Sequence, residues 1–218
     1  MEPLTIQSER MLFGCDDLQG TCTHPGLPDW GGDVYREFLA AILDKKFPCT
    51  FAALGLSERL CRFAFASDPR APRCADELAA AIAEYFDWLP TVPPEKDIYA
   101  VLIVCCAPIE EIEEESYRRI FEKLLREVNL RDPAPWPAQV PKQADKTKFT
   151  FCFGGREIFV NANTPSQPPH AWLHRGVVHL WPQAARLRAL GAHWRITPPL
   201  ASRTSSTAFP RFSDNPLT

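Results

Sequence analysis

The chain has 218 residues, of which 45% are hydrophobic and 23% charged, with a net charge of −3 and a pI near 6.0. This composition excludes a fibrous or fully disordered protein, and the length is sufficient to bury a core without disulfides. The slightly acidic balance argues against a dedicated nucleic-acid binder, whose surface would be basic. We expect one globular domain without a nucleic-acid partner.

Membrane and secretory signals are not visible in the sequence. The longest apolar run, residues 99–107, is too short to cross a bilayer. The first residues, Met-Glu-Pro-Leu-Thr, contain neither a basic nor an apolar leader segment. The eight cysteines are scattered and form no C-x-x-C pair. We therefore expect a cytoplasmic protein with reduced thiols and no membrane partner.

Composition changes sharply along the chain. Residues 1–164 contain 18 Lys or Arg and 26 Asp or Glu, whereas residues 165–218 contain six Arg, no Lys, no Glu and one Asp. We expect an N-terminal extension over 1–27, an α/β domain over 28–166, and a poorly ordered Arg/Pro/His-rich tail over 167–218. The tail has two open interpretations: a flexible Pro-rich segment, or a segment translated from another reading frame.

The first half of the expected domain alternates helices and strands. Apolar spacing predicts a helix over 34–43, directly after Asp33. Two short apolar runs, 51–54 and 61–66, predict strands. An alanine-rich helix then begins at Cys74 or Asp76 and ends near Leu89, before a group of prolines.

The second half adds a central strand, a long helix and a hairpin. Residues 99–107 form a continuous apolar run, which predicts a strand buried on both faces. A helix over about 109–128 carries acidic residues first and basic residues later, the order that the helix dipole favours. Residues 149–153 and 156–160 alternate around a Gly-Gly pair, which predicts a hairpin. The fold class is therefore α/β or α+β, a mixed sheet with flanking helices.

Catalytic motifs give little information. The chain contains no nucleophile elbow, P-loop, dinucleotide fingerprint or H-E-x-x-H sequence. His170 and His174 stand four residues apart and would share a helix face as a metal pair. Pro168 and Pro169 precede them and no acidic third ligand is near, so a chance pairing is the alternative.

Several short pieces follow one another in a characteristic order over about residues 28–166. They are Trp30, Phe47-Pro48-Cys49-x-Phe51, Arg62-Phe63-Ala64-Phe65, the apolar strand and acidic helix, Trp136-Pro137, Phe151-Cys152-Phe153, and Phe159 to Pro165. This ordered set resembles the YqcI/YcgG family, some members of which are heme-dependent N-oxygenases that hydroxylate the guanidino nitrogen of arginine or similar amino acids. The resemblance implies heme b, an iron-dependent monooxygenase (an oxidoreductase) and a small-molecule amine or guanidine substrate. The alternative is a catalytically silent relative that binds a small molecule or has no activity.

Within this resemblance, Cys49 and Arg62 are the candidate cofactor residues. Cys49 lies at a proline-fixed junction where a thiolate could bind the iron, or it is a small buried apolar residue. Arg62 could pair with a heme propionate or a substrate carboxylate, or it is an ordinary exposed strand arginine. A histidine ligand is the chemical rival to the thiolate, although His24 lies in a Gly/Pro loop and is expected to face solvent.

Polar residues gather where the hairpin strand ends. Asn161, Asn163 and Thr164 could line the mouth of a pocket or simply cap the strand; Arg62, Asn161 and Thr164 are the candidate catalytic residues. After Thr164 the chain departs from the family pattern, which has a histidine, a basic stretch and a final strand. Residues 177–181 are the nearest candidate for that strand, and 183–190 for a short basic helix. A segment that closes the sheet favours the enzyme, whereas a coil favours the silent relative.

Overall fold

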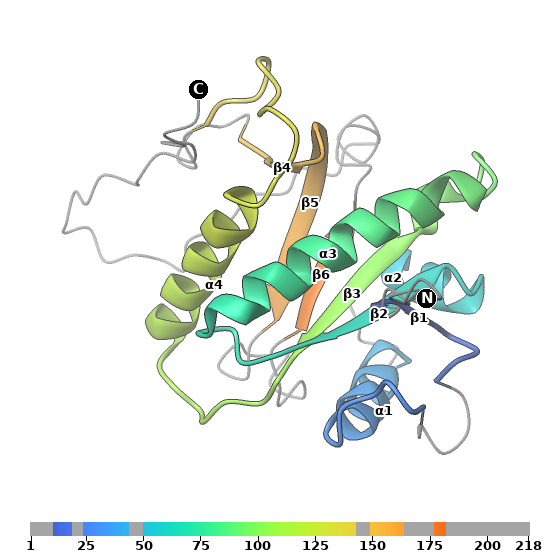
Figure 1. Cartoon of the computed structure of the whole chain (residues 1–218). Coiled ribbons are helices and arrows are strands. Elements are labelled where there is room, and N and C mark those ends of the chain that lie inside the picture. Colours follow the sequence, from blue (N-terminus) through green and yellow to red (C-terminus); the bar gives the residue numbers. More distant parts are fainter. Residues whose placement is uncertain (1–10, 19–23, 44–49, 143–148, 164–176, 182–218) are drawn as a thin grey trace, which may run out of the picture.

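The computed structural model describes residues 11–18, 24–43, 50–142, 149–163 and 177–181, which form a mixed sheet flanked by helices (Figure 1). This arrangement confirms the expected fold class. The helices are α1 (Gly31–Ile42), α2 (Thr50–Ser57), α3 (Pro72–Trp88) and α4 (Glu114–Asn129), with the 3-10 turns η1 (Leu89–Thr91) and η2 (Asp97–Tyr99). The strands are β1 (Phe13–Gly14), β2 (Cys61–Ala66), β3 (Val101–Cys106), β4 (Phe151–Phe153), β5 (Arg156–Asn163) and β6 (Val177–Trp181).

The six strands lie in the order β1-β2-β3-β6-β5-β4. Only β2 and β3 are parallel, and every other neighbouring pair is antiparallel. β6 therefore lies between β3 and β5, where Leu180 pairs with Leu102 on one side and Val160 on the other. Residues 177–181, the nearest candidate for the final strand, form β6. Both β1 and β6 fall outside residues 28–166, so the sheet uses chain from either side of the expected domain.

α3 and α4 cover one face of this sheet (Figure 1). α3 begins at Pro72, where a residue without an N–H costs no helical hydrogen bond. Its buried side chains recur with helical spacing and pack against alternate residues of β2 and β3. The same cluster takes in α4 and the inner residues of the β4–β5 hairpin. Its almost fully buried members include Leu78, Ile82, Tyr85, Leu102, Val128 and Ile158.

A second cluster packs α1 and α2 on the opposite face. α1 contributes Val34 and Phe38, both almost completely buried, against Phe63 of β2 and Ile103 of β3. Because β3 contributes residues to both clusters, all of its residues are buried. This confirms the prediction of a central strand buried on both faces.

The strand predicted over residues 51–54 is wrong, because this segment belongs to helix α2. A run of four apolar residues is too short to distinguish a strand from a buried helix by periodicity. The helix ends in a pair of hydrogen bonds, from Leu60 N–H to Gly55 O (2.7 Å) and from Arg59 N–H to Leu56 O (3.1 Å). With Arg59 at φ 59°, this is a Schellman ending that turns the chain into β2.

Several element boundaries also differ from the predictions. α4 begins at Glu114, not near residue 109, and Glu113 is extended at its N-cap. A helix over 109–113 would place like charges three and four residues apart, which destabilises it. The hairpin is confirmed, with Gly154 and Gly155 at φ 60° and 70° in the turn. However, β5 continues to Asn163, because β6 pairs with its second half.

Candidate functional site

Arg62 lies on β2 and contacts the end of α3. Its guanidinium carbon is 3.8 Å from the centre of the Trp88 ring. Its Nη1 donates a hydrogen bond to the carbonyl oxygen of Cys61 at 3.1 Å. Arg62 is directly opposite Leu102 in the ladder, on the sheet face that carries α3. In this position the side chain connects β2 to the last turn of α3.

The sequence predicted that Asn161 follows the end of the hairpin strand. The structure instead places it within β5. The register places it opposite His179 of β6, which in turn is opposite Ile103 of β3. Asn163 is likewise opposite Val177. Directly opposed positions in a ladder share one face, and Ile103 belongs to the face that carries α1 and α2. We call positions 161, 163 and 179 the β5–β6 polar row.

The structure does not bring Arg62 and Asn161 together. Arg62 is in the transverse line of positions that runs through Leu102 and Leu180 to Val160. Neighbouring strands are about 4.8 Å apart, so this line spans about 14 Å. Asn161, the next residue after Val160, belongs to the opposite face of the sheet. One ligand in contact with a single face of the sheet cannot reach both.

The remaining candidates lie outside the described residues. Cys49 immediately precedes α2, and Thr164 immediately follows β5. His170, His174 and the helix suggested over 183–190 also lie outside. His24 is described: its Nδ1 accepts a hydrogen bond from Gly26 N–H at 3.3 Å, and its ring packs edge-on against Phe13. The partly exposed His24 therefore belongs to a local turn.

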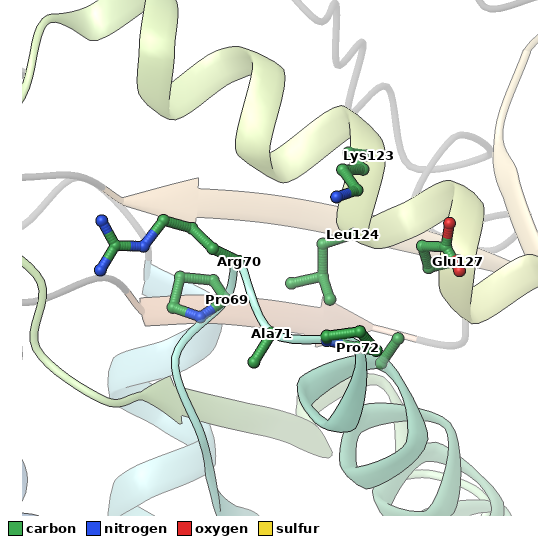
Figure 2. A pocket seen from close by; sticks show the side chains of 8 residues that line it. Pro69, Arg70, Ala71, Pro72, Lys123, Leu124 and Glu127 are labelled. Carbon is green, nitrogen blue, oxygen red and sulfur yellow. The ribbon is translucent and has the colours of Figure 1, made fainter.

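A small pocket that the sequence did not indicate lies between the β2–α3 loop and α4. Its volume is about 90 Å³, and Figure 2 shows the loop residues facing the α4 residues across it. It lies beyond the carboxyl end of β2, where ligands of open α/β sheets are commonly found. Pockets that enclose a small organic molecule measure about 300–1,000 Å³, so this one suits only a small group. It is lined by Pro69, Arg70, Ala71, Pro72, Ala75, Lys123, Leu124 and Glu127.

Arg70, at the edge of this pocket, is already paired with acidic side chains. Arg70 donates to both carboxylate oxygens of Asp68 and to Oε1 of Glu110 at 3.0 Å. These hydrogen bonds from Arg70 lower the pKa of the Asp68 carboxyl. The guanidinium is therefore neutralised by two acidic partners, which weakens the pocket as an anion site.

Cys105 and Cys106 are poor candidates for binding a heme iron, because thiolates are the ligating form. Complete burial raises the pKa of Cys105 to about 12. Hydrogen bonding to Cys74, together with burial, raises the pKa of Cys106 well above its ordinary value. The β5–β6 polar row has more suitable residue types, since imidazole is a common axial donor and amides hydrogen-bond to polar ligands. Position 179 is therefore a candidate on residue type and register.

Neither a metal-binding cluster nor a membrane-spanning helix occurs in the part of the chain that the structure describes. No group of three or more His, Cys, Asp or Glu side chains there is arranged to hold a metal ion. None of the helices in those ranges has both the length and the apolar character needed to cross a membrane.

Comparisons with known proteins identify the family. The model of the YqcI/YcgG family matches residues 17–171. Two proteins of Bacillus subtilis (strain 168), "Uncharacterized protein YqcI" and "Uncharacterized protein YcgG", are 34% and 32% identical over 146 residues, which is 64% of this chain and 56% of each relative. No solved structure matches the chain.

A third relative has a functional name. The "Putative N(omega)-hydroxy-L-arginine synthase DcsA" of Streptomyces lavendulae is 24% identical over 188 residues, which is 83% of this chain and 60% of that protein. The chain spans less than two thirds of the length of each of the three relatives. The family match covers most of the described sheet and its helices, including the candidate positions Arg62 and Asn161. The chain therefore belongs to the YqcI/YcgG family.

Proposed function

We propose that this protein is an N-oxygenase that hydroxylates a guanidino or amino nitrogen of a small molecule, with heme as its cofactor. The observation that carries the proposal is the position of β6 between β3 and β5, which places His179 opposite Asn161. A segment that completes the sheet in this way supports the enzyme over the silent relative. The relative named as an arginine N-hydroxylase supports the same class of reaction.

The β5–β6 polar row is the proposed site. An imidazole there would serve as axial donor to the iron, and heme supplies the activation of O2. The Asn161 amide would orient the guanidinium or amine of the substrate through its carbonyl oxygen. Cys49 is the competing ligand and would supply a thiolate. Oxygenation places one oxygen atom in an N–H bond and reduces the other to water, with two electrons and two protons from an external reductant.

The first test is the absorption spectrum of the full chain before and after addition of hemin. We expect stoichiometric uptake with a sharp Soret band, and the carbon monoxide complex of the reduced form separates thiolate from imidazole ligation. His179→Gln and Cys49→Ala are compared with Cys152→Ala, which alters a cysteine buried in β4. Whichever of His179→Gln and Cys49→Ala removes the iron ligand should lose the native spectrum, whereas Cys152→Ala should retain it. A folded protein that binds no hemin would overturn the heme proposal.

Activity is tested separately on the hemin-loaded protein. Arginine and simple amines are incubated with O2 and an NADPH-driven ferredoxin reductase pair, and the products are examined for the added mass of one oxygen atom. Heme uptake without product from any guanidine or amine would favour the second candidate, a catalytically silent binding protein.

A further inference from the structure

Two cysteines meet at the β1 edge of the sheet. β1 and β2 are antiparallel, with Phe13 opposite Phe63 and Gly14 opposite Arg62, so the next residues in this register are Cys15 and Cys61. The Cys15 thiol donates to the carbonyl oxygen of Cys61, with Sγ and O 3.8 Å apart. Opposed residues of an antiparallel pair have Cα atoms about 4.5–5.5 Å apart, within the range of about 4.4–6.8 Å that disulfides require.

The chemistry of Cys15 differs from that of the cysteines in the middle of the sheet. Hydrogen bonding to the Cys61 side chain lowers the pKa of the Cys15 thiol, and the nearby Arg62 guanidinium adds to the effect against the opposing effect of burial. A thiol with a lowered pKa has a larger thiolate fraction, and the thiolate is the species that peroxides oxidise. Cys15 is therefore the attacking thiol, and Cys61 is placed to resolve the product.

Another pair of neighbouring thiols provides an internal comparison. Cys74 of α3 and Cys106 of β3 are hydrogen-bonded and buried in the other cluster. Their mutual hydrogen bond and burial raise the pKa of Cys106, which keeps it in the unreactive thiol form. Proximity alone is thus common to both pairs, whereas the pKa is lowered at Cys15 and raised at Cys106.

The position of β1 gives an oxidant a route to this pair. Cys15 is 5% exposed and Cys61 is fully buried, so reaction requires the edge to open. β1 is two residues long and, within the described residues, pairs only with β2. A short edge strand separates from its sheet at a small fraction of the global unfolding free energy. Cys74 and Cys106, in contrast, lie between a 17-residue helix and a strand flanked on both sides.

We propose that Cys15 and Cys61 are a redox-modification site that forms a reversible disulfide on exposure to hydrogen peroxide. The Cys15 thiolate attacks one peroxide oxygen, the O–O bond breaks, and Cys15 becomes a sulfenic acid while the other oxygen leaves as water after protonation. The Cys61 thiol then attacks the Cys15 sulfur and releases a second water. Two thiols have lost two electrons and two protons, peroxide has been reduced to two waters, and a dithiol restores the starting state.

The experiment exposes the full chain to a small excess of hydrogen peroxide, alkylates the remaining thiols and maps the peptides by mass spectrometry. We expect one linked peptide pair containing Cys15 and Cys61, with a mass lower by two hydrogen atoms and reversal by dithiothreitol. Linkage should be lost in Cys15→Ala and in Cys61→Ala and retained in Cys106→Ala, the matched control. Thermal unfolding under reducing conditions verifies that each variant is folded.

The comparison also uses a second readout that does not depend on the variants. In the wild-type protein, Cys15 should be alkylated by iodoacetamide at least several-fold faster than Cys105 or Cys106 at neutral pH. Peroxide that links Cys74 to Cys106, or that leaves Cys15 alkylatable in folded protein, would overturn the proposal. Neither readout requires heme or activity, so failure here is distinct from failure of the proposed function.

Discussion

The guanidinium of Arg62 stacks on the ring of Trp88, so a residue near the start of β2 contacts the last residue of α3. The hydrogen bond from Arg62 to the Cys61 carbonyl fixes the same guanidinium to the strand. Arginine over the face of tryptophan is the most favourable form of the cation–π interaction. This contact gives Arg62 a positioning role in the fold, at a distance from the β5–β6 polar row.

Replacing either partner should therefore destabilise the protein. We expect Arg62→Ala and Trp88→Ala each to lower the free energy of unfolding by about 1–2 kcal/mol or more, because the stacking and the packing of both side chains are lost. A double-mutant cycle in urea should give a coupling energy of about 0.5–2 kcal/mol. Arg156→Ala is the control, since its guanidinium lies 5.0 Å from the Phe86 ring at an exposed position. A coupling near zero would contradict the positioning role.

Gly55 tests the helical assignment of α2. A Cβ at this position would collide with the backbone carbonyl oxygen of Tyr99. In an isolated helix, Gly→Ala stabilises by about 1 kcal/mol, but backbone atoms cannot yield as a flexible side chain does. We expect Gly55→Ala to lower the unfolding free energy by about 1–3 kcal/mol, measured by chemical denaturation.

The control for this prediction is Gly26→Ala. There the nearest atom to the added Cβ is a ring carbon of Phe13 at 3.6 Å, an ordinary contact. We expect a change within about 0.5 kcal/mol. If Gly55→Ala were as stable as the wild type, the close approach of α2 to Tyr99 would be incorrect.

Val178 tests the central position of β6. This strand has a partner on each side, and Val178 is opposite both Val104 and Ala162. Proline has no N–H, so Val178→Pro removes one hydrogen bond of the ladder and leaves a buried acceptor unpaired. We expect a loss of at least about 2 kcal/mol and increased aggregation from the released edges of β3 and β5.

Val178→Thr is the matched variant, because threonine retains both the β-branch and the N–H. Its unfolding midpoint should remain well above that of the proline variant, as followed by circular dichroism and light scattering. A proline variant that unfolds like the wild type would place β6 outside the central sheet. That outcome would also remove the observation on which the proposed function depends.

Asp68 gives a prediction for pH. Hydrogen bonds from Arg70 lower the pKa of this carboxyl in the folded protein. A lowered folded pKa contributes stability above the unfolded value of about 3.9, and this contribution is lost as the pH falls through the folded pKa. The pair is largely exposed, so we expect Asp68→Asn to cost no more than about 0.5 kcal/mol at pH 7.

The difference between wild type and Asp68→Asn should shrink below about pH 4, as the wild-type carboxylate becomes protonated. Urea unfolding at pH 7, 5 and 3 measures this change. Since salt screens an exposed pair, added sodium chloride should reduce the difference at pH 7. A difference that grows towards acidic pH would show that Asp68 acts through another contact.

The elements that could be predicted from the sequence are those with a strong hydrophobic pattern of their own. Continuous apolar character identified β3, helical spacing identified α1 and α3, and alternation around Gly154-Gly155 identified the β4–β5 hairpin. These patterns reflect burial of one or two faces, which each segment encodes within its own residues. The segment now known as α2 was misassigned because four apolar residues fit either period, and only packing of Gly55 against Tyr99 distinguishes them.

The tertiary structure alone decided which candidate residues share a site. Arg62 and Asn161 are both polar strand residues, but strand order and alternation place them on opposite faces of the sheet. His179 is a candidate only because β6 lies between β3 and β5. This places it opposite Ile103, a residue more than 70 positions earlier in the chain. Such long-range pairing cannot be predicted from the residues of one segment, since the pairing depends on which strand edge is free when the sheet forms. The sequence therefore gave the residue types, and the register of the sheet determined their neighbours.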